Sequence, residues 1–267
     1  MRATEIRDYF RDKATWVEWD GRTVDRFAYG NENVTVKGIA VGWTLTLEMA
    51  RQAAKAGANL FITHESIFYS GYRSEPAEPA QVERDRQRKA RELDRLKLTV
   101  LRCRDTWDRF PSVGIPDTWI RFLGFEDYRR APQSFYARAK LPSTTAATLA
   151  KRILKKVAPL GQQYVEVFNP AVKVSSLCVG TGSITELPLM REEAKADCYL
   201  VTNDGSRTST TELHATDLKI PLIRVDHATS ELPGMMALAD HLAEAFPGVP
   251  VKYIPYPCPY KLIAGGK

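Results

Sequence analysis

The sequence predicts an α/β protein of two lobes, each built on a mostly parallel sheet. Short apolar runs rich in β-branched residues alternate with stretches of helical spacing, and the second half of the chain repeats the order of the first. Parallel neighbours need a crossover, usually a helix, so this alternation favours parallel pairing. With 267 residues, of which 44% are hydrophobic, the chain is long enough to bury a full core.

The first half is predicted to form three strands separated by two helices. The second helix carries charges of both signs in alternation, which is typical of a solvated helix face and less so of a phosphate-binding stripe. A proline- and glycine-containing stretch at 108–119 is predicted as a loop. The strands are expected at 33–43, 59–64 and 98–101, with helices starting at Thr46 and at about Val82.

The second half begins after a proline-rich link, and we place the lobe boundary near residues 129–132, giving lobes 1–130 and 131–267. A strand follows the link, and Ser143 is the expected cap of the next helix. The expected strands then lie at 173–179, 197–203, 221–227 and 249–255, and the expected helices at 190–196, 210–218 and 232–246.

Composition excludes several classes of protein. No apolar run approaches 18 residues and the mean hydropathy is −0.31, so no membrane span is expected. The N-terminal residues mix charges with aromatics and lack the apolar core of a signal peptide, so a cytoplasmic location is expected. Four scattered cysteines indicate buried thiols rather than disulfides or a thiolate zinc site. The net charge of +6 permits an anionic substrate or nucleic acid without requiring either.

Histidine and carboxylate residues follow three of the expected strands. His64 and Glu65 end the strand at 59–64, Asp108 comes shortly after the strand at 98–101, and His227 with Glu231 follows the strand at 221–227. Open α/β sheets bind ligands at the carboxyl ends of their strands, so a shared metal site is one hypothesis. Each residue alone also has an ordinary structural role available, as a turn residue, a helix cap or a hydrogen-bonded core histidine.

Three stretches of the chain, in register, resemble the Nif-three-like family, also known as GTP cyclohydrolase I type 2 homologues. They are GANLFITHESIFYSG, LRCRDTWDRFPSVG and the segment from ADCYLVTNDGS to PVKYI, and the resemblance spans roughly residues 37–255. It implies a two-lobed α/β subunit with a dinuclear metal centre in a cleft between the lobes, and a toroidal homohexamer. The family's metal ligands fall on His64, Asp108, His227 and Glu231.

The chain departs from the family pattern at two informative positions. The family's fifth ligand is a second histidine, where this chain has Glu65, and a carboxylate moves the site towards oxygen-preferring metals. The expected cofactors are two divalent ions, with Mn or Fe favoured somewhat over Zn. Many relatives also carry a histidine where this chain has Arg104, which could hold an anionic substrate. The family's early WDN-x-G stretch survives only as Trp19 and Asp20, so no role is assigned to it.

Paired metals make hydrolysis the natural chemistry, with Glu231 as the bridging ligand and a cyclic amide, phosphoester or nucleotide as substrate. Arg104 would orient the substrate, and His214 would either relay protons or serve only as a helix residue. The alternative is a non-catalytic metal-binding or metal-delivery ring protein, for which association with nucleic acid is a further hypothesis. The segment VGTGS at 179–183 lacks the spacing of a nucleotide-binding loop, so its small residues are expected to permit a tight turn.

Overall fold

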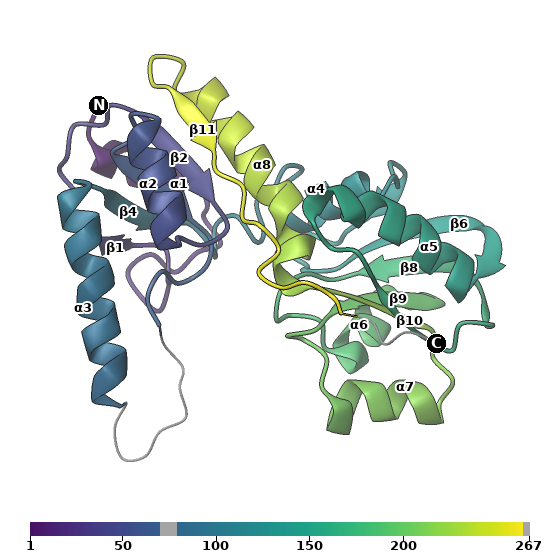
Figure 1. The fold of residues 1–267 in the computed structure, drawn as a ribbon. Helices are drawn as coiled ribbons and strands as arrows, with labels where there is room; N and C mark the ends of the chain where they lie inside the picture. The colour runs from purple at the N-terminus through teal and green to yellow at the C-terminus, as the bar shows by residue number, and fades with distance from the viewer. Residues whose placement is uncertain (70–78, 264–267) are drawn as a thin grey trace. The chain divides into compact units, whose positions relative to one another are not determined.

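The computed structural model describes residues 1–69 and 79–263, which leaves Ser70 and Gly71, the end of the first family motif, outside the described residues. Two compact units make up the chain, Met1–Trp107 with Met235–Tyr256, and Asp108–Gly234 with Pro257–Lys267. Each is a layered α/β structure, as predicted (Figure 1).

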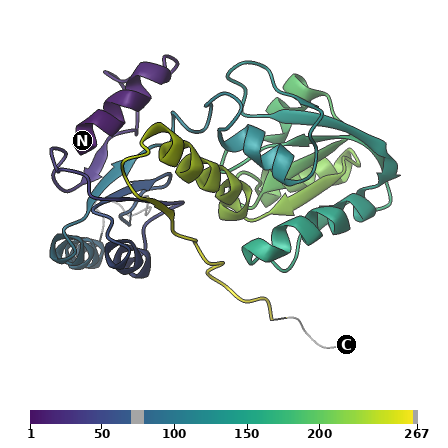
Figure 2. The same ribbon diagram turned by 90° about the horizontal axis from the view of Figure 1, so that it is seen from above.

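The first unit contains a five-stranded sheet of order β1-β4-β3-β2-β11, in which only the β1–β4 pairing is antiparallel within the described part of the chain. Helices α2 and α3 cover one face and α1 the other (Figure 2). The elements are α1 (Ala3–Lys13), β1 (Phe27–Tyr29), β2 (Ile39–Gly42), α2 (Leu47–Lys55), β3 (Leu60–Thr63), α3 (Ala80–Arg95), β4 (Thr99–Arg102) and β11 (Val251–Tyr253).

The second unit contains a six-stranded mixed sheet of order β5-β6-β8-β9-β10-β7. Its β8–β9 and β9–β10 pairings are parallel, and the other three are antiparallel. The prediction of a mostly parallel sheet is therefore wrong for this unit, because β6 follows β5 without the crossover helix that parallel neighbours need, and β6 and β7 pair antiparallel with β8 and β10. Helices α4 and α5 pack on one face, and α6 and α7 on the other (Figure 1). The elements are α4 (Ile115–Phe122), β5 (Tyr128–Arg129), β6 (Ala137–Thr145), α5 (Ala146–Val157), a 3-10 turn (Ala158–Leu160), β7 (Glu166–Phe168), β8 (Lys173–Val179), α6 (Leu187–Ala194), β9 (Cys198–Thr202), a π-helix (Thr208–Glu212), α7 (Leu213–Asp217) and β10 (Leu222–Val225).

Helix α8 (His227–Ala245) begins in the second unit and ends in the first. The division into units differs from the boundary at residue 130 expected from the sequence, for two reasons. Strand β11 pairs in parallel with β2, which returns residues 235–256 to the first sheet. At the other end, α4 buries Trp119, Ile120 and Leu123 in the core of the second sheet.

Local sequence explains most element boundaries. The hydroxyl of Thr46 accepts a hydrogen bond from the backbone N–H of Met49 at 3.1 Å and so caps α2 where the sequence predicted its start. The cap of α5 is Thr145, which accepts from the N–H of Thr148 at 3.2 Å, because β6 continues through the expected cap. The assignment of Ser143 as that cap was therefore wrong.

Two further local expectations need correction. The stretch predicted as a loop at 108–119 contains the start of α4, because Gly114 precedes a proline at the second helical position, a tolerated place for proline. His227, which the sequence placed at the end of the expected strand 221–227 and before the helix at 232–246, is the first residue of α8. This second correction places His227 and Glu231 one helical turn apart.

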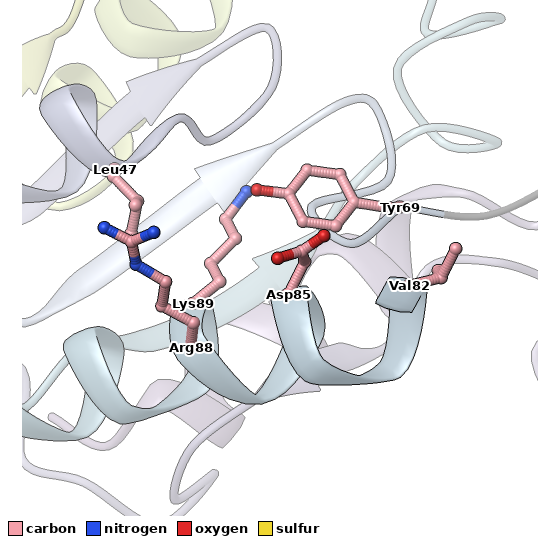
Figure 3. A pocket seen from close by; sticks show the side chains of 6 residues that line it. All are labelled: Leu47, Tyr69, Val82, Asp85, Arg88 and Lys89. Atoms are coloured by element: carbon pink, nitrogen blue, oxygen red, sulfur yellow. The ribbon is translucent and has the colours of Figure 1, made fainter. Parts of the chain in front are cut away.

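Helix α3 has one buried charge on its otherwise solvated face. The ammonium of Lys89 donates hydrogen bonds to the carbonyls of Leu45 and Ile67, which follow β2 and β3. Burial lowers the pKa of Lys89 to about 8. Its side chain lies on one wall of a small hollow with Tyr69, Asp85 and Arg88 (Figure 3). The charged helix therefore anchors the loop that starts with His64 and Glu65.

Within the described residues, no helix is long and apolar enough to cross a membrane.

A buried ion pair ties α4 to the segment after β5. The guanidinium of Arg130 lies 2.7 Å from the carboxylate of Asp117, and the two side chains are only 8% and 5% exposed. The hydroxyl of Tyr128 donates to the same carboxylate at 2.8 Å, and burial together with this bond raises the pKa of Tyr128 to about 12.

We predict that Arg130→Met lowers the free energy of unfolding by about 3 kcal/mol, because the buried carboxylate of Asp117 loses its cation. Arg129→Met is the control, since the exposed neighbour should change stability by less than about 0.5 kcal/mol. Urea unfolding followed by circular dichroism measures both. Equal effects of the two substitutions would contradict the assignment.

Candidate metal centre

The first unit presents His64 and Glu65 directly after β3. The backbone N–H groups of both residues donate to the carbonyl of Trp43, at 3.1 and 2.7 Å, which fixes the turn at the carboxyl end of the strand. His64 is fully buried, and its Nδ1 lies 3.5 Å from Oε1 of Glu65. The imidazole and the carboxylate therefore share one side of this sheet edge.

Two arginines flank the carboxylate of Glu65. The guanidinium of Arg102 donates to the backbone carbonyl of His64 at 2.8 Å and lies 3.4 Å from Oε2 of Glu65. Arg104 approaches Oε1 of the same carboxylate at 3.7 Å. Burial lowers the pKa of Arg102, while the charge of Glu65 opposes that shift. The two positions that depart from the family pattern, Glu65 and Arg104, are thus neighbours of opposite charge.

Asp25 organises the loop that follows β4, and sequence reasoning missed it. Its carboxylate is 4% exposed and accepts three backbone hydrogen bonds, from Arg104 at 2.6 Å, Asp105 at 2.9 Å and Thr106 at 2.7 Å. Burial raises the pKa of Asp25, whereas these hydrogen bonds oppose the shift. The loop that leads to Asp108 is therefore held by a residue about 80 positions earlier in the chain.

The second unit brings three ligand candidates together. Strands β8, β9 and β10 run parallel, so their carboxyl ends meet at one edge of the sheet. His227 starts α8 just beyond β10, and its Nε2 lies 3.2 Å from Oε2 of Glu231, one turn further along the helix. A carboxylate oxygen of Asp108 lies within 4.8 Å of one of Glu231. Asp108 and Glu231 are 6% and 2% exposed.

Asp204, at the end of β9, orients the ring of His227. Its Oδ2 lies 3.0 Å from Nδ1 of His227, and because an ionised carboxylate only accepts, Nδ1 carries the hydrogen. That assignment directs Nε2 towards Glu231. Metal-binding histidines commonly donate their other N–H to a carboxylate in this way. The sequence shows Asn-Asp-Gly here, which indicates only a turn.

Gly182 makes the arrangement sterically possible. Its φ is +58°, and a β-carbon at this position would lie 2.3 Å from Oε1 of Glu231 and 3.0 Å from Nε2 of His227. The N–H of Gly182 donates to the hydroxyl of Ser230 at 3.2 Å, and its carbonyl accepts from Thr202. The expectation that small residues at 179–183 permit a tight turn is confirmed at this glycine.

His214 lies on α7 and lines a hollow that Asp204 also lines. Its Nε2 is 3.3 Å from a guanidinium nitrogen of Arg191. Of the residues predicted from the sequence, the first unit holds His64, Glu65 and Arg104, and the second holds Asp108, His227, Glu231 and His214. Buried histidine and carboxylate side chains of this kind could hold metal ions, since they supply the nitrogen and oxygen donors that divalent metals use.

A family model described as Duf34/NIF3 (NGG1p interacting factor 3) matches residues 9–259, so the chain belongs to the Duf34/NIF3 family and the resemblance found in the sequence is confirmed. No curated protein matches the chain.

Solved structures share the fold at low sequence identity. A hypothetical protein of Staphylococcus aureus, SA1388, superposes with a TM-score of 0.78 at 16% identity, covering 98% of this chain and 99% of that one. A Bacillus cereus protein related to NIF3 gives 0.80 at 11%, with the same coverage. Reduced HcgD from Methanocaldococcus jannaschii gives 0.69 at 15%, covering 96% and 98%. These similarities establish the fold.

We predict that Gly182→Ala displaces the carboxylate of Glu231, because the added methyl group would collide with it and alanine disfavours the backbone angle. Stability should fall by about 1–3 kcal/mol, and Mn binding should weaken at least about tenfold. Gly248→Ala is the matched control, since its added carbon meets no atom within 4 Å. Denaturant unfolding and isothermal titration measure the two effects. Wild-type Mn affinity in Gly182→Ala would contradict the assignment.

We further predict that Glu65 and Arg104 are energetically coupled. Glu65→His removes the carboxylate that faces two guanidinium groups, so it should be tolerated better when Arg104→His is also present. A double-mutant cycle in urea should give a coupling free energy of about 0.5–1 kcal/mol, and the double variant should shift metal preference towards Zn. Strictly additive effects, with an unchanged ratio of Mn to Zn binding, would refute the coupling.

Proposed function

We propose that the chain binds two divalent metal ions through His64, Glu65, Asp108, His227 and Glu231, and that it is a metal-dependent hydrolase. The observation that carries this proposal is the His227 and Glu231 pair. Asp204 orients the imidazole at 3.0 Å, the carboxylate lies 3.2 Å from the other ring nitrogen, and Gly182 leaves room beside both groups. Such a pair is arranged for one cation.

The donor set favours particular metals. Two imidazoles and three carboxylates form a harder set than one with three imidazoles, so Mn or Fe should compete well against Zn. The arginines beside Glu65 support this proposal indirectly, because they hold its carboxylate beside His64. The same arginines also reduce the negative charge that Glu65 offers a metal, which would make its ion the more weakly held of the two.

Each residue around the ligands would have a separate role in hydrolysis. Bound as a pair, divalent ions act as Lewis acids that stabilise the attacking and departing oxygens. Asp204 holds His227 in one tautomer and orientation, as outer residues of metal sites do. Asp25 fixes the backbone that leads to Asp108. Arg104 would orient an anionic substrate, and His214, which lines the hollow beside Asp204, would relay protons.

A second candidate is a non-catalytic metal-binding or metal-delivery protein. The name of the family describes a factor that interacts with another protein, NGG1p, which favours a binding role. The same ligands would serve both functions. The toroidal homohexamer, association with nucleic acid and the cytoplasmic location remain predictions from the sequence.

Elemental analysis of the purified protein tests the proposal. We expect up to two first-row metal ions per chain, and His227→Ala should lose at least one of them because it removes a nitrogen ligand. His241→Gln is the control: this histidine bonds to Tyr9 at 2.9 Å and is not a proposed ligand. Unchanged metal content in His227→Ala would overturn the proposed centre.

Hydrolysis of a panel of phosphoesters, nucleotides and cyclic amides then separates the two functions. Turnover should require added Mn, Fe or Zn, stop on chelation, and fall at least about tenfold in Asp108→Asn, which changes a ligand's charge while keeping its shape. Full metal occupancy with no turnover on any compound would favour the binding protein.

A further inference from the structure

The second unit contains a hollow of about 500 Å³ that is lined by Asp204, the residue bonded to His227. Its walls come from the loops after β8 and β9, from the start of α6, and from the π-helix with α7. The residues that matter to its chemistry are Ser183, Glu186, Asp204, Arg207, Thr210 and His214.

Two residues that line the hollow, Asp204 and Ser183, are connected to the candidate metal ligands. Asp204 lines it and bonds to His227 at 3.0 Å. Ser183 lines it and directly follows Gly182, the residue that approaches Glu231 and His227 most closely. Both loops leave the carboxyl ends of parallel strands, where α/β sheets bind their ligands. A molecule in the hollow would therefore lie against the residues that hold the ligand pair.

Part of the hollow is lined by the π-helix at Thr208–Glu212, an uncommon kind of helix. Helical turns of this width are rare and occur frequently at functional sites. Its last residue, Glu212, pairs with Arg224, which also pairs with Glu166 of β7. These ion pairs fasten the π-helix to the sheet, while Thr210 and Thr211 line the hollow. The wide turn is thus anchored to the sheet through Glu212, which does not line the hollow.

The lining of the hollow combines one guanidinium, Arg207, with the imidazole of His214 and the carboxylates of Glu186 and Asp204. Arg207 is exposed, and its guanidinium has no ion-pair partner within residues 1–69 and 79–263. Arg191 can only donate, so Nε2 of His214 accepts from it and Nδ1 carries the hydrogen, which makes His214 a second donor. The negative charge of Asp204 already faces His227. Ser183, Thr210 and Glu186 supply hydrogen-bonding groups for hydroxyls.

We propose that this hollow binds a phosphate monoester of a polyhydroxylated small molecule, with the phosphate on Arg207 and His214. Guanidinium groups match phosphate geometry with two parallel hydrogen bonds, and a neutral imidazole N–H adds a third donor. The volume is sufficient for a pentose phosphate. This inference rests on the proposed function, because it names the class of molecule that would be held beside the metal centre.

Titration calorimetry on metal-free protein in a chelator tests the inference without any activity. The probes are ribose 5-phosphate, ribose and inorganic phosphate. Ribose 5-phosphate should bind most tightly, and ribose at least about tenfold more weakly, because ribose lacks the charged group that Arg207 would hold. Arg207→Gln should weaken ribose 5-phosphate binding about tenfold, and Arg207→Lys should recover part of that loss.

Lys219→Gln is the control, because it removes an exposed positive charge close to α7 but outside the hollow. Equal affinities for ribose 5-phosphate and ribose, or an Arg207→Gln variant indistinguishable from Lys219→Gln, would overturn the inference. The result is independent of the metal centre. Phosphate binding that depends on Arg207 would stand even if metal content were unchanged in His227→Ala, and its loss would leave the metal centre intact.

Discussion

Parallel pairing of β8, β9 and β10 is the constraint on which the candidate ligands of the second unit depend. Because these strands point the same way, the residues that follow them meet at one edge of the sheet. Gly182, Asp204 and His227 are far apart in sequence, and each comes within a few residues of a strand end. The order and direction of these strands thus bring together the imidazole of His227, the carboxylate of Asp204 that orients it, and Gly182, which leaves room beside it.

In the first unit, the carboxylate of Glu65 offsets the positive charge of two arginines beside His64. Two guanidinium groups approach Glu65 within 3.7 Å, and an imidazole at this position would remove the carboxylate that faces both of them. The carboxylate is therefore as well explained by its neighbours as by a metal. Glu65 and Arg104, the two departures from the family pattern, therefore add one negative and one positive charge that offset each other. A change in metal preference would follow from this paired substitution.

Sequence reasoning succeeded where the signal is local and periodic. The helix start at Thr46, the buried strand before His64 and the last long helix follow from capping, apolar runs and helical spacing. It failed where a local signal competed with packing. The proline and glycine around α4 indicated a loop, yet Trp119 and Ile120 bury a full helical face.

The residues of the candidate site likewise differ in whether a local sequence signal identifies them. Histidines and carboxylates at strand ends are visible in the sequence because each residue type is distinctive in itself. Asp25 and Asp204 could not be found, since each acts on a segment far away in the chain, and nothing near either one in sequence shows its partner. Two-residue strands such as β5 are likewise set by pairing alone.

The return of β11 to the first sheet has a consequence for how the protein is made. Its partner β2 leaves the ribosome more than 200 residues earlier, so the first sheet stays without this edge strand while all of the second unit's strands are synthesised. The second sheet needs only Tyr128 to Val225, a continuous segment. During translation the later unit can therefore acquire its native sheet before the earlier one, and the exposed edge of β2 is the part of the nascent chain most in need of protection from chance pairing.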